Sequence, residues 1–358
     1  MKILIVIGTR PQIIKASILK DAFHKRGLET ILVHTGQHYT NELSELIMKD
    51  VGLSVPDHNL SVGSGNYRYQ ISEGFTKLNP IVKDEKPDWV VCIGDSNPAL
   101  VGCLSAISNG LPLAHCEAGL RSGNVTEPEE KNRLFIDSLS DLLFCSTHEC
   151  IENLRKEGLS GNAILTGDLL LDTWHKYAAD TNIEVQDNLG EGFLLFTTHR
   201  KSNAYNRKRF TKIVSILLSL KSEKILWPIH PGVEKELISS DLMKFISKST
   251  NIEIIPSVSY TEMKYFLTEC KAVITDSVGL QIESYFAQKK SILLRNESEY
   301  EHLELIGWSK KCRIENLGPT EFEKNMSEFL SLVPKKYEEE LFGDGNACES
   351  MLKEIVSA

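Results

Sequence analysis

Apolar residues fall in short uninterrupted runs along this chain, and longer segments of mixed, helix-like character separate them. The first run covers residues 2–7, Lys-Ile-Leu-Ile-Val-Ile. A run without alternation is typical of a parallel strand buried on both faces. Strands are predicted in two series, at residues 2–7, 30–34, 89–93, 112–116, 142–145 and 163–165, and then at 193–197, 224–228, 252–255, 272–275 and 291–294. Strands alternating with helices predict an α/β fold with mainly parallel sheets covered on both faces.

The two series also predict two domains, because 358 residues exceed the usual size of one compact domain. Residues 178–191 are polar, have no clear strand pattern and lie between the series. We therefore place the domain change near Asp168, with a helix and this polar segment bridging it.

Composition narrows the class of protein. Hydrophobic residues make up 41% and charged residues 25%, and no apolar run is long enough to cross a membrane, so we expect a cytoplasmic protein without a membrane partner. The net charge of −9 argues against a nucleic-acid partner but leaves room for local basic sites. The cysteines lie mostly in or beside apolar segments and show no CxxC spacing, so they read as core residues, among them Cys92, Cys103, Cys116 and Cys145.

A dense group of charges follows the strand predicted at residues 112–116. Residues 115–123 read His-Cys-Glu-Ala-Gly-Leu-Arg-Ser-Gly, and residues 128–133 read Pro-Glu-Glu-Lys-Asn-Arg. Carboxylates gathered at a strand end in an open α/β sheet can exchange protons with a bound substrate. The alternative is that these groups form solvated ion pairs at strand and helix ends.

Three strand ends carry turns suited to an anion. Gly8-Thr9-Arg10-Pro11 follows the first strand, so Arg10 stands at a helix N-terminus, where phosphate or carboxylate is attracted. Gly94-Asp95-Ser96 and Thr275-Asp276-Ser277-Val278-Gly279 follow strands in the two halves of the chain. Asp-Ser also makes an ordinary helix cap, so the repetition in both halves is what favours a binding role. Without a GxGxxG fingerprint, a dinucleotide cofactor has little support.

Eight segments, in this order, resemble the non-hydrolysing UDP-N-acetylglucosamine 2-epimerases. They are Gly8-Thr9-Arg10-Pro11-Gln12-Ile13-Ile14-Lys15, Thr35-Gly36-Gln37-His38, Gly94-Asp95-Ser96, residues 115–123, residues 128–133, Thr198-His199-Arg200, Pro228-Ile229-His230 and residues 275–283. The ending, Gly343-Asp344-Gly345-Asn346-Ala347, also resembles that family. Arg10-Pro11-Gln12 and Glu299-Tyr300-Glu301 look closer to the branch acting on UDP-2,3-diacetamido-2,3-dideoxy-glucuronate.

The resemblance implies a GT-B-like pair of Rossmann-like domains with the active site in the cleft between them. The last helix would return to the first domain, giving residues 1–168 with 346–358, and residues 169–345. The implied reaction inverts C2 of a UDP-N-acetylhexosamine, or of a UDP-diacetamido-hexuronate, through loss and return of UDP. It needs no metal or other cofactor. The resemblance further implies a homodimer and a role in making surface polysaccharide precursors.

Site residues follow from the same resemblance. Proton transfer falls to Asp95, Glu117 and Glu129, because removing a carbon-bound proton and delivering another to the opposite face takes two positioned groups. His199 is counted among the catalytic positions because the resemblance implies that it holds the departing diphosphate. The remaining positions would bind substrate or orient the acids: Arg10, Lys15, Asn132, Arg133, His230, Ser277, Val278 and Gly279, with Glu283 on the ribose hydroxyls.

Each assignment has a structural alternative. Asp95 could cap the helix that begins near Asn97, and Glu117 could pair with Arg121. Glu129 could simply stabilise the N-terminus of its own helix by interacting with the helix dipole. His199 and His230 could be satisfied histidines at strand ends.

The sequence also departs from the family pattern. Ser277-Val278-Gly279 replaces the usual Ser-Gly-Gly, and Ile282 and Glu299-Tyr300-Glu301-His302 stand where other residues are common. Val278 either disturbs the contact with the diphosphate or packs harmlessly away from it with an ordinary φ. Two other functions stay open, a GT-B glycosyltransferase and a UDP-sugar-binding homologue without turnover.

Overall fold

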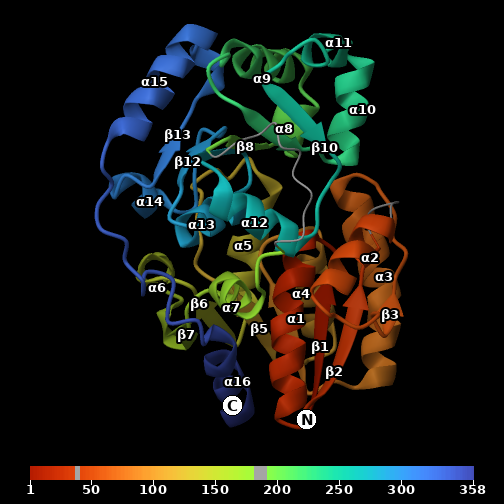
Figure 1. The fold of residues 1–358 in the computed structure, drawn as a ribbon. Coiled ribbons are helices and arrows are strands. Elements are labelled where there is room, and N and C mark those ends of the chain that lie inside the picture. Colours follow the sequence, from red (N-terminus) through yellow and green to blue (C-terminus); the bar gives the residue numbers. More distant parts are fainter. Residues whose placement is uncertain (37–40, 181–191) are drawn as a thin grey trace. The chain divides into compact units, whose positions relative to one another are not determined.

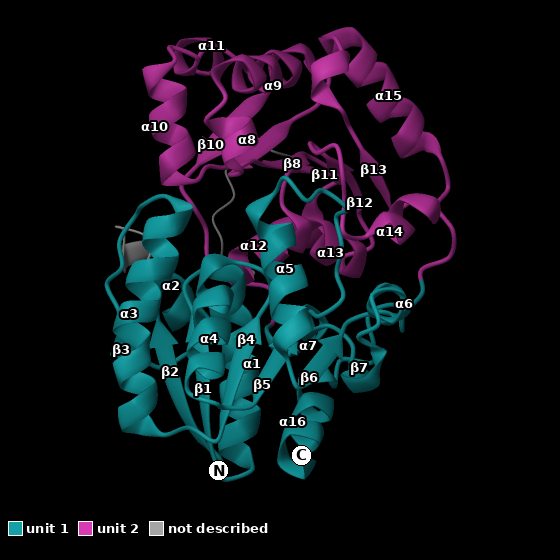
Figure 2. Ribbon diagram, turned by 180° about the vertical axis from the view of Figure 1, so that it is seen from behind, with its two compact units in different colours: residues 1–177, 338–358 teal, residues 178–337 magenta. Residues whose placement is uncertain are grey.

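The structure is a computed structural model that describes residues 1–36, 41–180 and 192–358. Gln37 and His38 of one family-like segment, and residues 181–191 of the polar stretch, lie outside the described residues. The chain divides into two compact units (Figure 2). Unit 1 comprises residues 1–177 and 338–358, and unit 2 comprises residues 178–337.

Unit 1 is built on a seven-stranded sheet in the order β3-β2-β1-β4-β5-β6-β7, in which all paired neighbours run parallel. Its strands are β1 (Lys2–Ile7), β2 (Glu29–His34), β3 (His58–Asn59), β4 (Trp89–Ile93), β5 (Leu113–Cys116), β6 (Leu142–Cys145) and β7 (Ala163–Leu165). The helices are α1 (Arg10–Lys25), α2 (Asn41–Asp50), α3 (Tyr67–Glu85), α4 (Asn97–Ser108), α5 (Pro128–Leu139), α6 (His148–Lys156), α7 (Leu169–Lys176) and α16 (Ala347–Ser357). Strand and helix alternation therefore gives the predicted parallel architecture (Figure 1).

Local sequence explains where the first helix begins. Strand β1 is buried from Ile3 to Ile7, and the chain then turns at Gly8. Gln12 closes the N-terminus of α1, because its Oε1 accepts hydrogen bonds from the backbone N–H groups of Gly8 and Thr9 at 2.9 and 3.1 Å. Its Nε2 donates to the carbonyl of Ile93 at 2.9 Å and ties the turn to the end of β4.

The C-terminal helix returns to unit 1 and packs against α1 and α7 (Figure 1). Asp172 of α7 accepts the backbone N–H groups of Ala347 and Cys348 at 3.1 and 2.8 Å, so it satisfies donors at the N-terminus of α16. Residues 169–177 and 338–345, which we had expected in the second domain, belong to unit 1. The reason is that α7 packs on α1, while the Asp168 N–H bonds to the Phe342 carbonyl at 2.9 Å.

Unit 2 holds a six-stranded sheet in the order β10-β9-β8-β11-β12-β13, again with parallel pairs. Its strands are β8 (Leu194–Thr197), β9 (Ile225–Pro228), β10 (Ile252–Ile255), β11 (Ala272–Thr275), β12 (Lys290–Leu293) and β13 (Ser309–Lys311). The helices are α8 (Lys201–Ala204), α9 (Arg207–Ser219), α10 (Pro231–Ser239), α11 (Met243–Ile246), α12 (Tyr260–Glu269), α13 (Val278–Phe286), α14 (Glu301–Leu305) and α15 (Pro319–Ser331).

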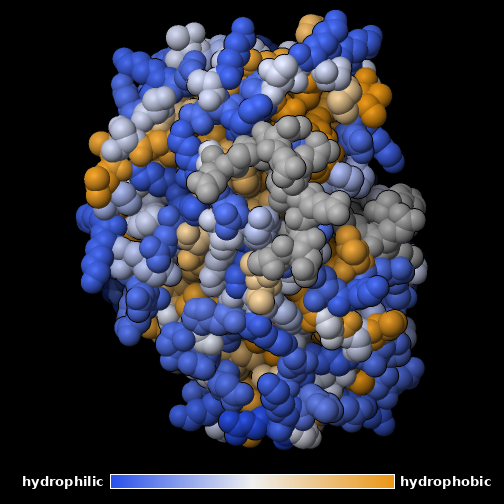
Figure 3. Space-filling model, in the orientation of Figure 1, coloured by the Kyte–Doolittle hydropathy of each residue, from blue (hydrophilic) through white to orange (hydrophobic). Residues whose placement is uncertain are grey.

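Each sheet packs on its own apolar core. In unit 1 the core joins β1, β2 and β4 to α3 and α4, and in unit 2 it includes Trp227, with Phe196 edge-on at 4.7 Å between ring centroids. Hydrophilic residues cover most of the face drawn in Figure 3. Among the described helices, none is long and apolar enough to span a bilayer.

Candidate active site

Polar turns follow the carboxyl ends of adjacent strands in both sheets. In unit 1 they come after β1, β4 and β5, and in unit 2 after β8, β9 and β11. The strand order reverses direction between β1 and β4, and again between β8 and β11. Ligands of open α/β sheets bind at such switch points, so the turns named by the sequence lie where this fold binds ligands.

Glu117, directly after β5, has an unusual backbone. Its φ is 70°, in the left-handed region that disfavours residues with a side chain. Its carboxylate forms an ion pair with the Nζ of Lys15 from α1, and the two side chains are only 16% and 6% exposed. Strain of this kind persists where the surroundings fix the residue, and it concentrates at functional sites. Glu117 thus pairs with Lys15, whereas Arg121 pairs with Asp137 and Glu157, at 2.7 and 2.6 Å.

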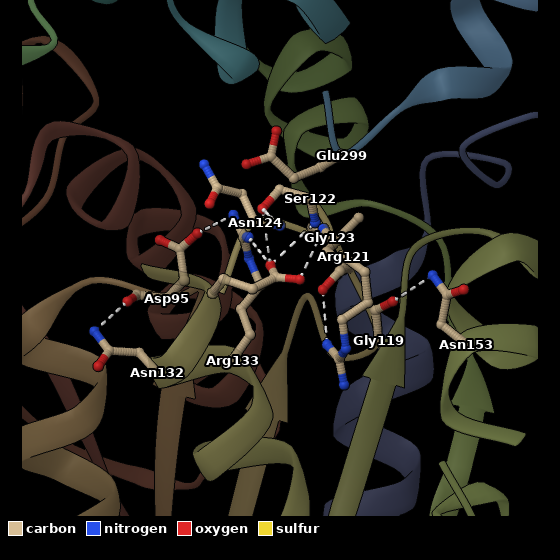
Figure 4. A network of polar contacts seen from close by, with 12 residues as sticks. Asp95, Gly119, Arg121, Ser122, Gly123, Asn124, Asn132, Arg133, Asn153 and Glu299 are labelled. Carbon is tan, nitrogen blue, oxygen red and sulfur yellow. Dashed lines mark hydrogen bonds and ion pairs between the residues drawn. The ribbon is translucent and has the colours of Figure 1, made fainter. Parts of the chain in front are cut away.

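Asp95 follows β4 and lies in a second ion pair. Its Oδ2 contacts the Nη2 of Arg133 from α5, while its backbone carbonyl accepts the Asn132 amide at 2.7 Å (Figure 4). The N-cap of α4 is Ser96, so the Asp95 carboxylate is not used as a helix cap. Arg133 and Asn132 are buried, whereas the Asp95 side chain remains 29% exposed. The arrangement holds one carboxylate in place and leaves part of it accessible.

Two neighbouring glutamates of α5 differ in their surroundings. Glu130 is buried, accepts the backbone N–H groups of Ser122 and Gly123 at 3.0 Å, and pairs with Arg133 at 2.7 Å. Glu129 is half-buried and, among the described residues, its carboxylate has no hydrogen bond or ion pair. Burial raises the pKa of the Tyr67 hydroxyl, and the nearby charge of Glu129 raises it further. Glu130 is therefore a structural residue, and Glu129 is the carboxylate of this pair that is available for chemistry.

A fully buried layer lies beneath these acids. His115 contacts the Asp137 carboxylate through Nδ1 at 2.6 Å and the Gly94 carbonyl through Nε2 at 2.9 Å. Burial disfavours the charged form of Asp137, but the charges of His115 and Arg121 and their hydrogen bonds lower its pKa nonetheless. This layer holds the loop after β5 to the helix α5 that follows it.

In unit 2, Asp276 organises the turn that carries His199. Asp276 is fully buried after β11 and accepts the backbone N–H groups of His199 and Arg200, both at 3.1 Å. The Thr198 hydroxyl and the Asn203 amide donate to it at 2.7 and 2.9 Å. Although burial opposes ionisation, the charge and hydrogen bonds of these neighbours, with His199 foremost, hold the pKa of Asp276 well below its usual range.

The His199 ring remains accessible beside this anchor. Its Nδ1 lies 3.2 Å from Asp276 Oδ1, and the side chain is 51% exposed. A ring held through Nδ1 presents Nε2 outward, which suits contact with an anion.

The other predicted residues of unit 2 lie at helix N-termini. Ser277 is the N-cap of α13, and its hydroxyl accepts the Leu280 N–H at 3.3 Å. Val278 and Gly279 are the first two residues of that helix, and neither has a positive φ. Valine therefore adopts an ordinary backbone at this turn. His230 is the exposed N-cap of α10, and its Nδ1 accepts the Gly232 N–H at 3.1 Å.

Glu283 and Arg10 complete the set of predicted positions. Glu283 lies in α13 and is 8% exposed. Burial lowers the pKa of Lys264 in α12, and the charge of Glu283 opposes that shift. Arg10 is the first residue of α1, at the switch point of the unit 1 sheet. Unit 1 thus brings together Arg10 and the residues Lys15, Asp95, Glu117, Glu129 and Arg133, while His199, His230, Ser277, Val278, Gly279 and Glu283 lie in unit 2.

Sequence reasoning assigned no separate role to Asp276, Glu130, His115 or Asp137, although all of them except Asp137 lie in quoted segments. A signal existed for the pair in α5. Glu130, Arg133 and Asp137 recur at spacings of three and four, so they occupy one helix face together with the buried Ile136. The cysteines agree with the prediction, because Cys92, Cys103, Cys116 and Cys145 are all buried and unpaired. Within the described residues there is no group of three or more His, Cys, Asp or Glu side chains arranged to hold a metal ion.

Comparison with known proteins places the chain in a family. The family model for UDP-N-acetylglucosamine 2-epimerase matches residues 21–356, so the chain belongs to this family of isomerases. It is 34% identical over 313 residues to UDP-2,3-diacetamido-2,3-dideoxy-D-glucuronate 2-epimerase of Pseudomonas aeruginosa, with 86% of this chain and 87% of that protein covered.

Solved structures agree with the fold. The crystal structure of UDP-GlcNAc 2-epimerase of Methanocaldococcus jannaschii, in complex with UDP-GlcNAc and UDP, is similar with a TM-score of 0.93, 29% identity and complete coverage of both chains. The glycosyltransferase SnogD of Streptomyces nogalater shares the fold alone, with a TM-score of 0.54, 11% identity, and 99% and 98% of the chains covered. The predicted GT-B-like α/β fold is therefore confirmed.

Proposed function

We propose that this protein inverts C2 of a UDP-N-acetylhexosamine, or of a UDP-diacetamido-hexuronate, by eliminating and re-adding UDP. The observation that carries the proposal is the arrangement of Glu117, Asp95 and Glu129 at the ends of β5 and β4 and the start of α5. Two of these carboxylates are held by the buried cations Lys15 and Arg133, and the third is unengaged among the described residues. Such a set supplies both a base and an acid.

The reaction balances with these groups alone. A carboxylate takes the C2 proton while the C1–O bond breaks, and UDP leaves with the electron pair to give a glycal. A second acid then delivers a proton to the opposite face of C2, and a phosphate oxygen of UDP forms the C1–O bond again. Nothing is oxidised or reduced overall. We assign both proton transfers to Asp95, Glu117 and Glu129 without dividing the steps among them.

The departing diphosphate requires fixed donors where negative charge builds up. We assign this role to Arg10, His199, His230 and the turn of Ser277, Val278 and Gly279. The support is their placement at helix N-termini and strand ends, where backbone N–H groups are available to an anion. Glu283 would accept the hydrogen bonds of the two ribose hydroxyls.

The test is an incubation in D₂O with UDP-N-acetylglucosamine and, separately, its 2,3-diacetamido-uronate analogue, followed at C2 by NMR. No acceptor is added, so inversion reports epimerisation and excludes glycosyl transfer. We expect deuterium at C2 of the product, because the departing and arriving protons pass through exchangeable groups. Complete retention of the original hydrogen would overturn the elimination route, and the sugar that turns over identifies the substrate branch.

Two wider roles belong to the same proposal. The product is expected to feed surface polysaccharide precursors, and the protein is expected to act as a homodimer. Analytical ultracentrifugation tests the second point directly, because a sedimenting species of one chain mass would contradict it.

A further inference from the structure

His115 occupies an unusual position between two hydrogen-bond acceptors. It lies in β5 with no exposed surface, and its two ring nitrogens contact Asp137 Oδ1 at 2.6 Å and the Gly94 carbonyl at 2.9 Å. A backbone carbonyl can only accept a hydrogen bond, so Nε2 must carry a proton to make this contact favourable.

The contact at Nδ1 likewise requires a proton on the ring nitrogen, because its partner is an oxygen of the Asp137 carboxylate. The other oxygen of Asp137, Oδ2, already accepts the Gly119 N–H at 3.1 Å and contacts Arg121 Nη2 at 2.7 Å. Because Asp137 is paired with the Arg121 guanidinium and accepts a backbone N–H through the same oxygen, it is ionised, and Oδ1 accepts a hydrogen bond from the His115 ring. In a neutral imidazole one ring nitrogen donates and the other accepts. One of the two contacts would then bring a nitrogen lone pair against the lone pair of an accepting oxygen. Both ring nitrogens of His115 must therefore carry protons.

The buried charge is balanced by its neighbours. Asp137 faces the ring from α5, and Arg121, from the loop after β5, shares that carboxylate and also pairs with Glu157 after α6 at 2.6 Å. From the side of α1, Lys15 is paired with Glu117. A cation buried without such partners would be expelled or neutralised, whereas a paired and hydrogen-bonded one is tolerated.

The ring also supports the turn that carries Asp95. Gly94 has a φ of 66° and donates its N–H to the Cys116 carbonyl at 3.0 Å, while its own carbonyl accepts from His115. A Cβ built on Gly94 would lie 3.1 Å from Glu117 Oε2, so the turn that His115 contacts also passes close to the Glu117 carboxylate.

We infer that His115 is held as an imidazolium and acts as a positioning residue that fixes the Asp95 turn and supplies a cation beneath Asp95 and Glu117. This inference rests on the proposed function, since the roles of the two acids are part of that proposal. A fixed cation favours the ionised form of a neighbouring carboxylate. Losing it should therefore leave the base protonated up to a higher pH and loosen the turn at Gly94.

The protonation state is measured directly on the wild-type protein. With ¹⁵N-labelled histidine, one-bond ¹H–¹⁵N signals report which ring nitrogens carry protons. We expect both nitrogens of His115 to be protonated in the active protein, with the ring signals assigned by through-bond correlation to the His115 backbone. A single protonated nitrogen at pH 7 would overturn the inference, and the result does not depend on turnover.

Kinetics test the positioning role. In His115→Asn and Asp137→Asn we expect kcat to fall by about 10- to 100-fold, the effect of losing a residue that orients an active group. In His115→Asn we also expect the acid limb of the kcat–pH profile to move to higher pH, because a cation is lost. In both variants UDP affinity should change less than about twofold. The matched control is Asp141→Asn, because Asp141 accepts the Leu113 N–H at 2.9 Å at the other end of β5. It should leave the pH profile unchanged.

A fall in kcat without movement of the profile in His115→Asn would reduce His115 to a structural role. If both variants fail to fold, the wild type still decides the matter. Loss of the second ring proton at a pH where wild-type kcat is constant would overturn the positioning role, and retention across the active range would support it. A wild type inactive on both sugars would overturn the proposed function and the positioning role, while the NMR measurement would still settle the protonation of His115.

Discussion

The ammonium of Lys15, in the second turn of α1, forms an ion pair with the carboxylate of Glu117 at the end of β5, 102 positions later in the chain. The contact bridges two parts of the sheet that are not direct neighbours, since β4 lies between β1 and β5. Lys15 was predicted only to bind substrate or orient an acid, and this pair gives it a definite partner. It also fixes the orientation of a carboxylate whose backbone has a positive φ.

Glu117→Gln should lower kcat by a factor of roughly 10²–10⁴, because an amide cannot take or give the proton. UDP affinity, measured by titration calorimetry, should change little, since this group serves proton transfer. Glu149→Gln, at an exposed position of α6, is the control and should behave as wild type. Near wild-type turnover in Glu117→Gln would remove this residue from the mechanism.

Glu129→Gln and Glu130→Gln should separate activity from stability. The first should lose roughly 10²–10⁴ in kcat with an unchanged melting temperature, because Glu129 is unengaged among the described residues. The second should lose about 2–4 kcal/mol of unfolding free energy, because it leaves Arg133 without part of a buried ion pair. Urea unfolding and initial rates on both variants check this, and the reverse pattern would contradict it.

Val278→Ala and Val278→Gly should both leave the UDP dissociation constant within about twofold of wild type. The reason is that Val278 begins α13 without a positive φ, so its N–H is already oriented by the helix. The glycine variant alone should lose up to about 1 kcal/mol of stability, the usual cost of glycine in a helix. Tighter binding in both variants would show instead that the valine side chain hinders the diphosphate.

Asp172 should make stability depend on pH. Burial raises its pKa to about 6, against the hydrogen bonds from Cys348 and Ala347, which lower it. A carboxyl whose folded-state pKa exceeds its unfolded value of 3.8 stabilises the fold below about pH 4 and loses that contribution as the pH rises through 6. The unfolding free energy of wild type minus that of Asp172→Asn should fall by about 1–3 kcal/mol between pH 4 and pH 7.5. A difference independent of pH in urea titrations would refute the shift.

Turnover should survive treatment with EDTA and extensive dialysis, and adding nicotinamide nucleotides should not change it. The proposed elimination uses proton transfer and fixed donors only, so it has no step for a metal or a redox cofactor. Initial rates before and after chelation check this. Activity that disappears with EDTA and returns with one metal would contradict it.

The apolar strands could be read from the sequence almost to the residue. β1, β4, β6, β7, β10 and β11 match their predicted bounds. β1, β4 and β11 lie inside their sheets and are continuous apolar runs, as expected of a parallel strand buried on both faces. β7 and β10 lie at sheet edges and are only partly buried, but they are still short, mainly apolar runs. β3, only His58–Asn59, and β13, Ser309–Lys311, were not predicted. Both are short and polar edge strands, so they carry no apolar run that could mark them in the sequence.

The site could be predicted only as a set of residues. Strand ends indicated where Asp95 and Glu117 would lie, since the carboxyl ends of parallel strands share one edge. Their partners depend on tertiary structure. Nothing in the local sequence indicates that Arg121 pairs with Asp137 or that Lys15 pairs with Glu117. A charged residue at these positions reads as solvated until the packing is known.

The return of α16 to unit 1 has a consequence for synthesis on the ribosome. Unit 2 is one continuous stretch, residues 178–337, whereas unit 1 needs residues 338–358 to complete the surface formed by α1 and α7. Domains generally fold as units while the chain emerges. Unit 1 of the nascent chain is therefore incomplete while unit 2 is being synthesised. During this time the Asp172 carboxylate lacks the N–H groups of Ala347 and Cys348 that it accepts in the folded protein. During that interval the apolar surface later covered by α16 is exposed to chaperones, and a stop codon just before residue 347 would leave it so permanently.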